Sequence, residues 1–296
     1  MQEDILCIGS VLWDVIGRSA SHMRAGSDVP GRITRVPGGV AMNIAMTLRR
    51  FGMKPVLLTA IGRDAEGDGL VAEAKRMGLD TAFAYRSEDL PTDVYMAIEG
   101  ANGLIAAIAD AHSLEAADDK ILKPLFDGRL ATEMTPYGGV VALDGNLTTD
   151  LLSRISQSAV FSAADLRIAP ASPGKANRLL ALSTHPRATF YVNKEEAGLL
   201  CQTEFEDAAT AAGRLVSSGV RRALVTDGGK TAAEMTAGQE IITAEPPEVM
   251  VTRVTGAGDT FMAAHIAHEM AGADRQTALR QALQAAANYV AGETPL

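Results

Sequence analysis

A turn of small residues carrying one carboxylate lies near the end of the chain. Residues 254–261, VTGAGDTF, join a β-branched run to an apolar stretch that predicts a helix. Glycines let main-chain N–H groups approach an anion, and the new helix points its positive end at the same place. Asp259 could take a proton from an attacking hydroxyl while the N–H groups of Gly256, Ala257 and Gly258 stabilise a transferred phosphoryl group. The pattern predicts phosphoryl transfer; the alternative is a glycine-rich loop in which Asp259 only caps the helix.

A second candidate site precedes the first predicted helix. Gly38 and Gly39 stand directly before that helix, and Asn43 lies one turn inside it. Main chain without side chains can pack against a flat polar ligand, and an asparagine offers both a donor and an acceptor to ring hydroxyls. Asp14, which follows the first predicted strand, could hold two vicinal hydroxyls. The alternatives are an ordinary glycine pair before a helix and a solvated turn aspartate.

A third candidate site follows the predicted strand 188–192. Asn193 and Glu196 are three residues apart on a beginning helix, so their side chains share a face. Such a pair could order a Mg²⁺–nucleotide complex through water. The alternative is a helix capped by Asn193 with acidic residues in its first turn.

Composition excludes several other classes of function. The 296 residues are 47% hydrophobic and 21% charged, which is typical of a folded globular protein. A net charge of −9 without long basic clusters argues against nucleic acid polymers and anionic membranes as partners, although one nucleotide in a pocket fits. Two cysteines make neither a disulfide framework nor a metal site. With an acidic N-terminus and no membrane-length apolar run, the chain is expected to be cytoplasmic.

Predicted strands and helices alternate along most of the chain. This alternation predicts an α/β fold, a mostly parallel sheet with helices on both faces. Ligands of such sheets bind beyond the carboxyl ends of the strands, where the three candidate sites fall. The predicted strands are 5–10, 55–61, 139–143, 166–169, 188–192 and 222–226, and the predicted helices are 40–51, 66–77, 149–164, 175–182, 208–217, 258–271 and 275–291.

Two segments depart from the alternation. Residues 16–37 are polar and contain short alternating pieces, and residues 94–109 predict a hairpin around the turn 100–103. Together they predict a small antiparallel sheet, a β lid that would exclude water from the site. The alternative is an extra edge of the main sheet. The predicted division is 1–15, 38–90 and 111–296 for the main domain and 16–37 and 91–110 for the lid.

The chain resembles the ribokinase-like (PfkB) family of sugar and nucleoside kinases over nearly its whole length. Residues 37–43, PGGVAMN, and residues 255–261, TGAGDTF, match the two signatures of that family, with Asn-x-x-Glu at 193–196 between them. The resemblance implies a three-layer ribokinase-like fold with a lid, and transfer of phosphoryl from ATP, with Mg²⁺, to an alcohol. It also implies a role for each matched position. Asp259 is the base, Gly256, Ala257 and Gly258 form the anion hole, Asn193 and the metal-site residue Glu196 serve Mg-ATP, Thr226, Asp227, Gly228 and Gly229 line the nucleotide, Asn288 lies near adenine, and Asp14, Gly38, Gly39 and Asn43 hold the acceptor.

One position departs from the family pattern. Many relatives carry an aspartate two residues before the threonine of the second signature, where it helps to bind an activating monovalent cation. This chain has Arg253 there, and its charge would repel a cation. A monovalent cation site of the usual kind is therefore not expected.

Within the family the chain is most similar to pseudouridine kinases, in residues 95–98, 108–110, 143–147 and 169–175, although Ala169 stands where an acid is expected. Asn43, Thr92, Asp110 and Asn146 could present polar groups to a uracil edge; the alternative is that Asp144 and Asn146 only satisfy the main chain of their loop. The expected activity is phosphorylation of the 5′-hydroxyl of pseudouridine.

The alternative activities are a kinase for a free sugar (ribose, fructose or 2-keto-3-deoxygluconate) or for another nucleoside. A ligand-binding module without catalysis is a further alternative. The first strand-to-helix connection has no Gly-x-Gly-x-x-Gly, which argues against a dinucleotide-dependent oxidoreductase. Members of this family often pair their lids across a homodimer, and the sequence leaves the oligomeric state of this chain open.

Overall fold

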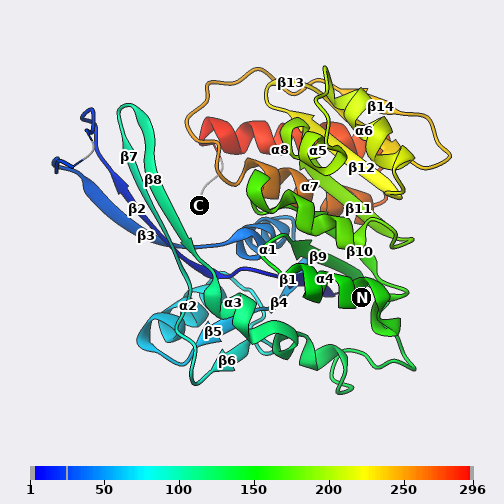
Figure 1. The fold of residues 1–296 in the computed structure, drawn as a ribbon, viewed down its shortest axis with the longest axis horizontal. Helices are drawn as coiled ribbons and strands as arrows, with labels where there is room; N and C mark the ends of the chain where they lie inside the picture. Colours follow the sequence, from blue (N-terminus) through cyan, green and yellow to red (C-terminus); the bar gives the residue numbers. More distant parts are fainter. Residues whose placement is uncertain (1–3, 25, 294–296) are drawn as a thin grey trace.

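The computed structural model describes residues 4–24 and 26–293. Its main sheet has the strand order β14-β13-β12-β11-β10-β9-β1-β4, with six neighbouring parallel strands and two antiparallel strands at one edge (Figure 1). These strands are β1 (Asp4–Ile8), β4 (Lys54–Leu58), β9 (Val140–Asp144), β10 (Asp165–Ala169), β11 (Ala188–Asn193), β12 (Arg222–Asp227), β13 (Lys230–Thr236) and β14 (Ile242–Ala244).

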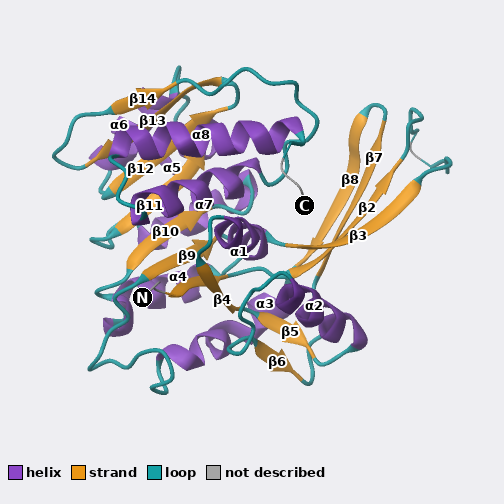
Figure 2. Ribbon diagram, turned by 180° about the vertical axis from the view of Figure 1, so that it is seen from behind, coloured by secondary structure: helices purple, strands orange, loops and turns teal. Residues whose placement is uncertain are grey.

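Helices cover both faces of this sheet. Strand β1 shows why: Ile5 and Cys7 point into one apolar cluster, whereas Leu6 and Ile8 point into the other, and all four are fully buried. Helices α1 (Val40–Arg50), α2 (Ala65–Arg76), α7 (Ala257–Met270) and α8 (Arg275–Ala291) pack on the first face, with α1, α7 and α8 prominent in Figure 2. The other face carries α3 (His112–Ala117), α4 (Thr149–Gln157), α5 (Lys194–Cys201), α6 (Ala208–Ser217) and the 3₁₀ helices η1 (Asp118–Leu125), η2 (Ala159–Phe161) and η3 (Pro173–Leu182).

The lid is a separate four-stranded sheet that projects from the body (Figures 1 and 2). Its order is β3-β2-β7-β8, from strands β2 (Leu12–Arg18), β3 (Arg32–Gly38), β7 (Val94–Gly100) and β8 (Gly103–Asp110). The prediction of a separate small sheet is confirmed, but its fully antiparallel character is wrong, because β2 and β7 pair in parallel. Each of these two strands leaves the body through its own connection and runs outward in the same direction.

Other local predictions also need correction. The predicted strand 55–61 divides at Thr59 into β4 and β5 (Ala60–Gly62), and β5 pairs with β6 (Tyr85–Ser87) in a two-stranded sheet. The predicted helix 149–164 stops at Gln157, because Ser158 is extended and its hydroxyl accepts a bond from Val160 N. Residues 175–182 form part of the 3₁₀ helix η3 rather than an α-helix. None of the described helices is long and apolar enough to cross a bilayer.

Candidate active site

The predicted base lies in the first turn of α7. A 2.9 Å hydrogen bond from Asn43 Nδ2 to Asp259 Oδ2 joins this turn to the start of α1. Burial raises the pKa of Asp259 to about 7; the negative charges of Asp144, Asp14 and Glu196 raise it further, and the bond from Asn43 opposes the rise. Asp259 is therefore half-ionised near neutral pH, which suits a carboxylate that accepts a proton.

The turn before Asp259 differs in detail from the predicted anion hole. Gly256 adopts a φ of +88°, and a Cβ there would stand 2.6 Å from the Tyr289 hydroxyl, so only glycine fits. Gly258 has open space where a Cβ would project. The N–H of Ala257 donates to Val254 O at 3.0 Å, so in this conformation it closes the turn instead of facing an anion.

The C-terminal helix holds this turn from the other side. The Tyr289 hydroxyl donates to Thr255 O at 2.8 Å. Arg253 Nε donates to Tyr289 O at 2.8 Å, and its guanidinium carbon lies 3.8 Å from the Tyr289 ring centre. A fixed positive charge therefore lies beside the turn. It occupies the position where many relatives carry the aspartate that helps to bind a monovalent cation.

The residues predicted to hold the acceptor lie around two carboxylates. Asp14 lies on β2 of the lid, and burial raises its pKa to about 6. A Cβ at Gly38 would stand 2.1 Å from Asp14 Oδ2, and a Cβ at Gly39, with a φ of +94°, would stand 2.5 Å from Ser10 O. The two glycines thus make room for Asp14 and for the 9–11 loop.

Asp144, at the end of β9, is the second of these carboxylates and is fully buried. It accepts bonds from Ser10 N at 2.8 Å, Ser10 Oγ at 3.1 Å, Ala41 N at 3.1 Å and Asn146 N at 2.8 Å. A Cβ at Gly9 would stand 2.3 Å from this carboxyl group. Asp144 therefore fixes the 9–11 loop, the start of α1 and Asn146 relative to one another.

Three predicted acceptor residues use their polar atoms within the protein. Asn146 Nδ2 donates to Ser10 Oγ at 2.8 Å, and its Oδ1 accepts from Lys175 Nζ at 2.6 Å. The Thr92 hydroxyl donates to Asp64 Oδ1 at 2.6 Å and is buried. Asp110 is exposed at the end of β8 and pairs with His112 at 2.7 Å. Among the described residues no hydrogen bond joins Thr92 or Asp110 to Asp14 or Asp259.

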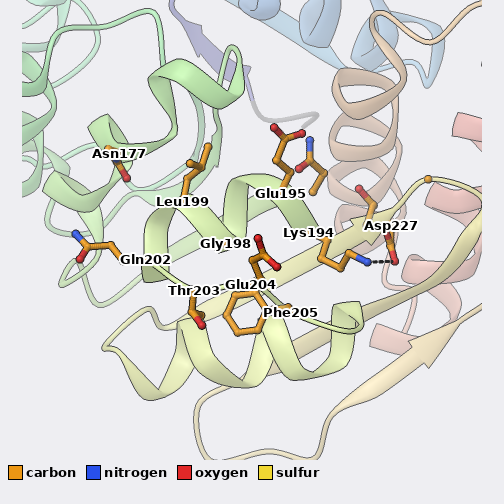
Figure 3. Close-up of a pocket in the computed structure, with 13 residues that line it drawn as sticks. Asn177, Lys194, Glu195, Gly198, Leu199, Gln202, Thr203, Glu204, Phe205 and Asp227 are labelled. Atoms are coloured by element: carbon orange, nitrogen blue, oxygen red, sulfur yellow. Dashed lines mark ion pairs between the residues drawn. The ribbon is translucent and has the colours of Figure 1, made fainter.

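Four of the residues predicted for the nucleotide lie together at the ends of β11 and β12. Asn193 and Thr226 are register partners, and both line a cavity of about 950 Å³ that also touches Asp227 and Gly228 (Figure 3). The cavity continues along α5 to Gln202 and Phe205, which the sequence did not indicate.

Lys194 was also missed by the sequence interpretation, although it lies between the two predicted residues Asn193 and Glu196. Its Nζ forms a 2.8 Å ion pair with Asp227 Oδ2, and both residues line this cavity (Figure 3). Gly229 lies in the exposed β12–β13 turn. Asn288 lies on α8, half-buried, where its Oδ1 accepts from Gln284 Nε2 at 2.8 Å.

Asn193 and Glu196 form a reciprocal capping box at the start of α5. Glu196 N donates to Asn193 Oδ1, and Asn193 N donates to Glu196 Oε2, both at 2.8 Å. The two residues therefore cap α5, as the alternative interpretation predicted, and the cap uses one carboxylate oxygen of Glu196. Burial raises the pKa of Glu196. No cluster of three or more histidine, cysteine or acidic side chains suited to a metal occurs in residues 4–24 and 26–293. Asn193 and Glu196 offer oxygen donors, the type of ligand that Mg²⁺ takes when it keeps several waters and binds with substrate phosphates.

Comparison with known proteins assigns the chain to a family. Residues 2–293 match the pfkB family carbohydrate kinase. The chain is 31% identical over 152 residues to an uncharacterized sugar kinase, YeiI, of Escherichia coli; the match covers 51% of this chain but only 40% of that protein. It is 27% identical over 265 residues to the pseudouridine kinase of Escherichia coli, covering 88% of this chain and 81% of that enzyme.

The fold comparison agrees. The structure of Arabidopsis thaliana ribokinase complexed with ribose and ATP aligns with a TM-score of 0.79 at 21% identity, over 98% of this chain and 93% of the ribokinase. The ribokinase-like fold, with its parallel sheet and separate lid sheet, is thus confirmed. With the match to nearly every residue, this chain belongs to the pfkB family of carbohydrate kinases.

Proposed function

We propose that this chain transfers the γ-phosphoryl group of ATP to the 5′-hydroxyl of pseudouridine. The observation that carries the phosphotransfer is Asp259, raised to a pKa of about 7 and held by Asn43 at the positive end of α7. Asp259 takes the proton of the hydroxyl as the 5′-oxygen bonds to phosphorus. The bond from phosphorus to the β–γ bridging oxygen breaks, and ADP leaves.

The chain's own groups stabilise the charge of the transferred group. The first turn of α7 carries a partial positive charge, and Gly258 leaves open space for a close approach of phosphate oxygens. Mg²⁺, when bound with the nucleotide, would neutralise phosphate charge. Asn193 and Glu196 would hold it through water, Thr226, Asp227, Gly228 and Gly229 would line the phosphates, and Asn288 would lie near adenine.

The choice of acceptor is supported by a relative and by the polar groups of Asp14 and Asn43 beside Asp259. The pseudouridine kinase of Escherichia coli matches most of this chain. Asp14, Gly38 and Gly39 would hold the ribose hydroxyls, and Asn43 would orient them beside Asp259. A pocket built to bond a base rejects a plain sugar, because its buried polar groups would stay unpaired.

A free-sugar kinase is the second candidate. It is favoured by the side chains of Thr92 and Asn146, whose polar atoms bond within the protein instead of facing an acceptor. Release of ADP, measured with pseudouridine, uridine, ribose, fructose and 2-keto-3-deoxygluconate, separates the candidates. Turnover with pseudouridine at the highest kcat/KM supports the proposal, and preference for a free sugar rejects it.

A homodimer through the lid belongs to the same proposal. Strand register places the side chains of Ile33, Met96, Ile98 and Ile108 on one face of the lid, opposite the face that carries Asp14, and Ile33 is 79% exposed. A second copy brings the same apolar face, which is the requirement of a two-fold interface. Light scattering should give a dimer for the wild type and a monomer for Ile33→Asp/Ile108→Asp.

A further inference from the structure

Lys175 is a half-buried cation beside Asn146, one of the residues predicted to contact the acceptor. It lies in η3, just beyond the carboxyl end of β10, and its ammonium donates to Asn146 Oδ1 at 2.6 Å. Among the described residues no carboxylate comes within ion-pair distance of it, whereas its neighbour Arg178 pairs with Glu115 at 2.8 Å. Burial lowers the pKa of Lys175 and the charge of Arg178 lowers it further, whereas the negative charges of Asp144, Glu115 and Asp93 oppose the shift.

The hydrogen bonds from Lys175 have only one possible direction. An ammonium can only donate, so Asn146 turns its oxygen toward Lys175 and its Nδ2 toward Ser10 Oγ, 2.8 Å away. Ser10 Oγ already accepts from Val40 N at 2.9 Å and therefore gives its own proton to Asp144. A series of hydrogen bonds thus runs from the ammonium of Lys175 through Asn146 and Ser10 to the buried carboxylate of Asp144. It uses both the oxygen and the nitrogen of the Asn146 amide.

The same series of hydrogen bonds connects Lys175 with the residues predicted to hold the acceptor. Val40 begins α1, and one turn further Asn43 contacts Asp259. Lys175, the α1 N-terminus and the base are therefore parts of one edge of the sheet. Two of the three ammonium protons remain for a ligand, since Asn146 takes one.

We infer that Lys175, not Asn146, binds the end of the acceptor remote from the reacting hydroxyl, and that this end carries a carbonyl or carboxylate oxygen. The inference rests on the proposed phosphotransfer and narrows its acceptor class. An oxygen of that kind satisfies the ammonium, while Asn146 fixes the position of the ammonium from behind. Pseudouridine offers a base carbonyl, 2-keto-3-deoxygluconate offers a carboxylate, and cyclic ribose offers neither.

The test compares Lys175→Met, Lys175→Arg and, as a matched control, the exposed Lys123→Met of another 3₁₀ helix, η1. The readout is kcat/KM for pseudouridine, 2-keto-3-deoxygluconate and ribose. In Lys175→Met the preference for the carbonyl or carboxylate acceptor over ribose should fall about 10–100-fold, the loss expected for a charged hydrogen bond. Lys175→Arg should recover part of it, and Lys123→Met should match the wild type.

Two results would overturn the inference. One is an equal loss with all three acceptors, which indicates a structural role for Lys175. The other is an unchanged preference in Lys175→Met. If the wild type phosphorylates none of the acceptors, the proposed function fails instead. Calorimetric titration with pseudouridine then decides about Lys175, because the inference requires binding that is lost in Lys175→Met.

Discussion

Asn43 and Asp259, 216 residues apart in the sequence, are joined by a 2.9 Å hydrogen bond between the first turns of two helices. The bond connects the glycine pair before α1 with the glycine-rich turn before α7. It also makes Asn43 a donor to the carboxylate form of Asp259, so it limits how far burial raises that pKa. The two helix starts act as one chemical unit.

Replacing the base should abolish turnover without removing the site. Asp259→Asn keeps the size of the side chain but cannot accept a proton, so kcat should fall by about 10²–10⁴-fold. Steady-state kinetics measure the loss, and calorimetry should show nearly unchanged binding of nucleotide and acceptor. Asp150→Asn, an exposed first-turn aspartate of α4, is the matched control. Near-normal turnover of Asp259→Asn would reject the assignment.

Activity should fall on the acid side of neutrality. The pKa of Asp259 is about 7, so below that pH the carboxyl group is increasingly protonated and cannot act as a base. A profile of kcat/KM against pH should therefore show an acid limb near pH 7. Asn43→Leu removes a donor that lowers this pKa, so its limb should move to higher pH. A limb near pH 4, the ordinary aspartate value, would contradict the described site.

Substitution of Gly256 and of Gly258 by alanine should have different effects on the stability of the fold. Gly256→Ala places a Cβ 2.6 Å from the Tyr289 hydroxyl at a φ of +88°, so thermal unfolding should show a loss of about 1–3 kcal/mol. Adding Tyr289→Phe to Gly256→Ala should restore part of the lost stability, because it removes the hydroxyl that the new Cβ would meet. Gly258→Ala meets open space and should keep the wild-type stability. If phosphate approaches there, kcat alone should fall in Gly258→Ala.

The rate should not depend on a monovalent cation. The Arg253 guanidinium, stacked on Tyr289, supplies a fixed positive charge beside the 254–256 turn. Assays in KCl, NaCl and choline chloride at equal ionic strength should give the same kcat. Arg253→Gln should lower kcat in all three salts, because the turn loses its connection to Tyr289. A stimulation of the wild type by K⁺ alone would contradict this expectation.

Acid stability should depend on a buried ionic network behind the site. Burial would raise the pKa of Glu269, but the charges of Arg167 and Arg222 lower it to about 2. Its ionised form therefore stabilises the fold above the unfolded pKa near 4.5, and this contribution is lost as the pH falls toward 2.

Glu269→Ala leaves both guanidinium groups without this partner. It should lower the free energy of unfolding at neutral pH by about 3–5 kcal/mol. Urea unfolding at several pH values should show the difference from wild type shrinking in acid. The exposed Glu133→Ala should show no such dependence.

Local patterns predicted the layers of the fold and the edge of the sheet where the candidate residues gather. The alternation of strands and helices was sufficient for the parallel strands, because each was bounded by turn residues. The partner of a strand is a long-range property, so the parallel pairing of β2 with β7 did not follow from either segment. Ser158 shows that helix ends were also hard to predict from local patterns. Its hydroxyl bonds to the main chain, and α4 ends before it.

The side-chain directions within the site were the least predictable. The sequence placed Asn146 near the acceptor, but only the structure shows that Lys175 and Ser10 take both ends of its amide. Likewise, no pattern indicates that Ala257 N closes a turn with Val254 O. Such choices depend on neighbours that are distant in sequence and compete for the same proton.

Asp14 is attached to β2, so it belongs to the projecting sheet although it stands against Gly38 and the body. Any swing of that sheet must carry this carboxylate with it. An acceptor bound by Asp14 would therefore also be bound to the lid. Tighter binding of the acceptor by Asp14 would then favour the lid position that covers the site.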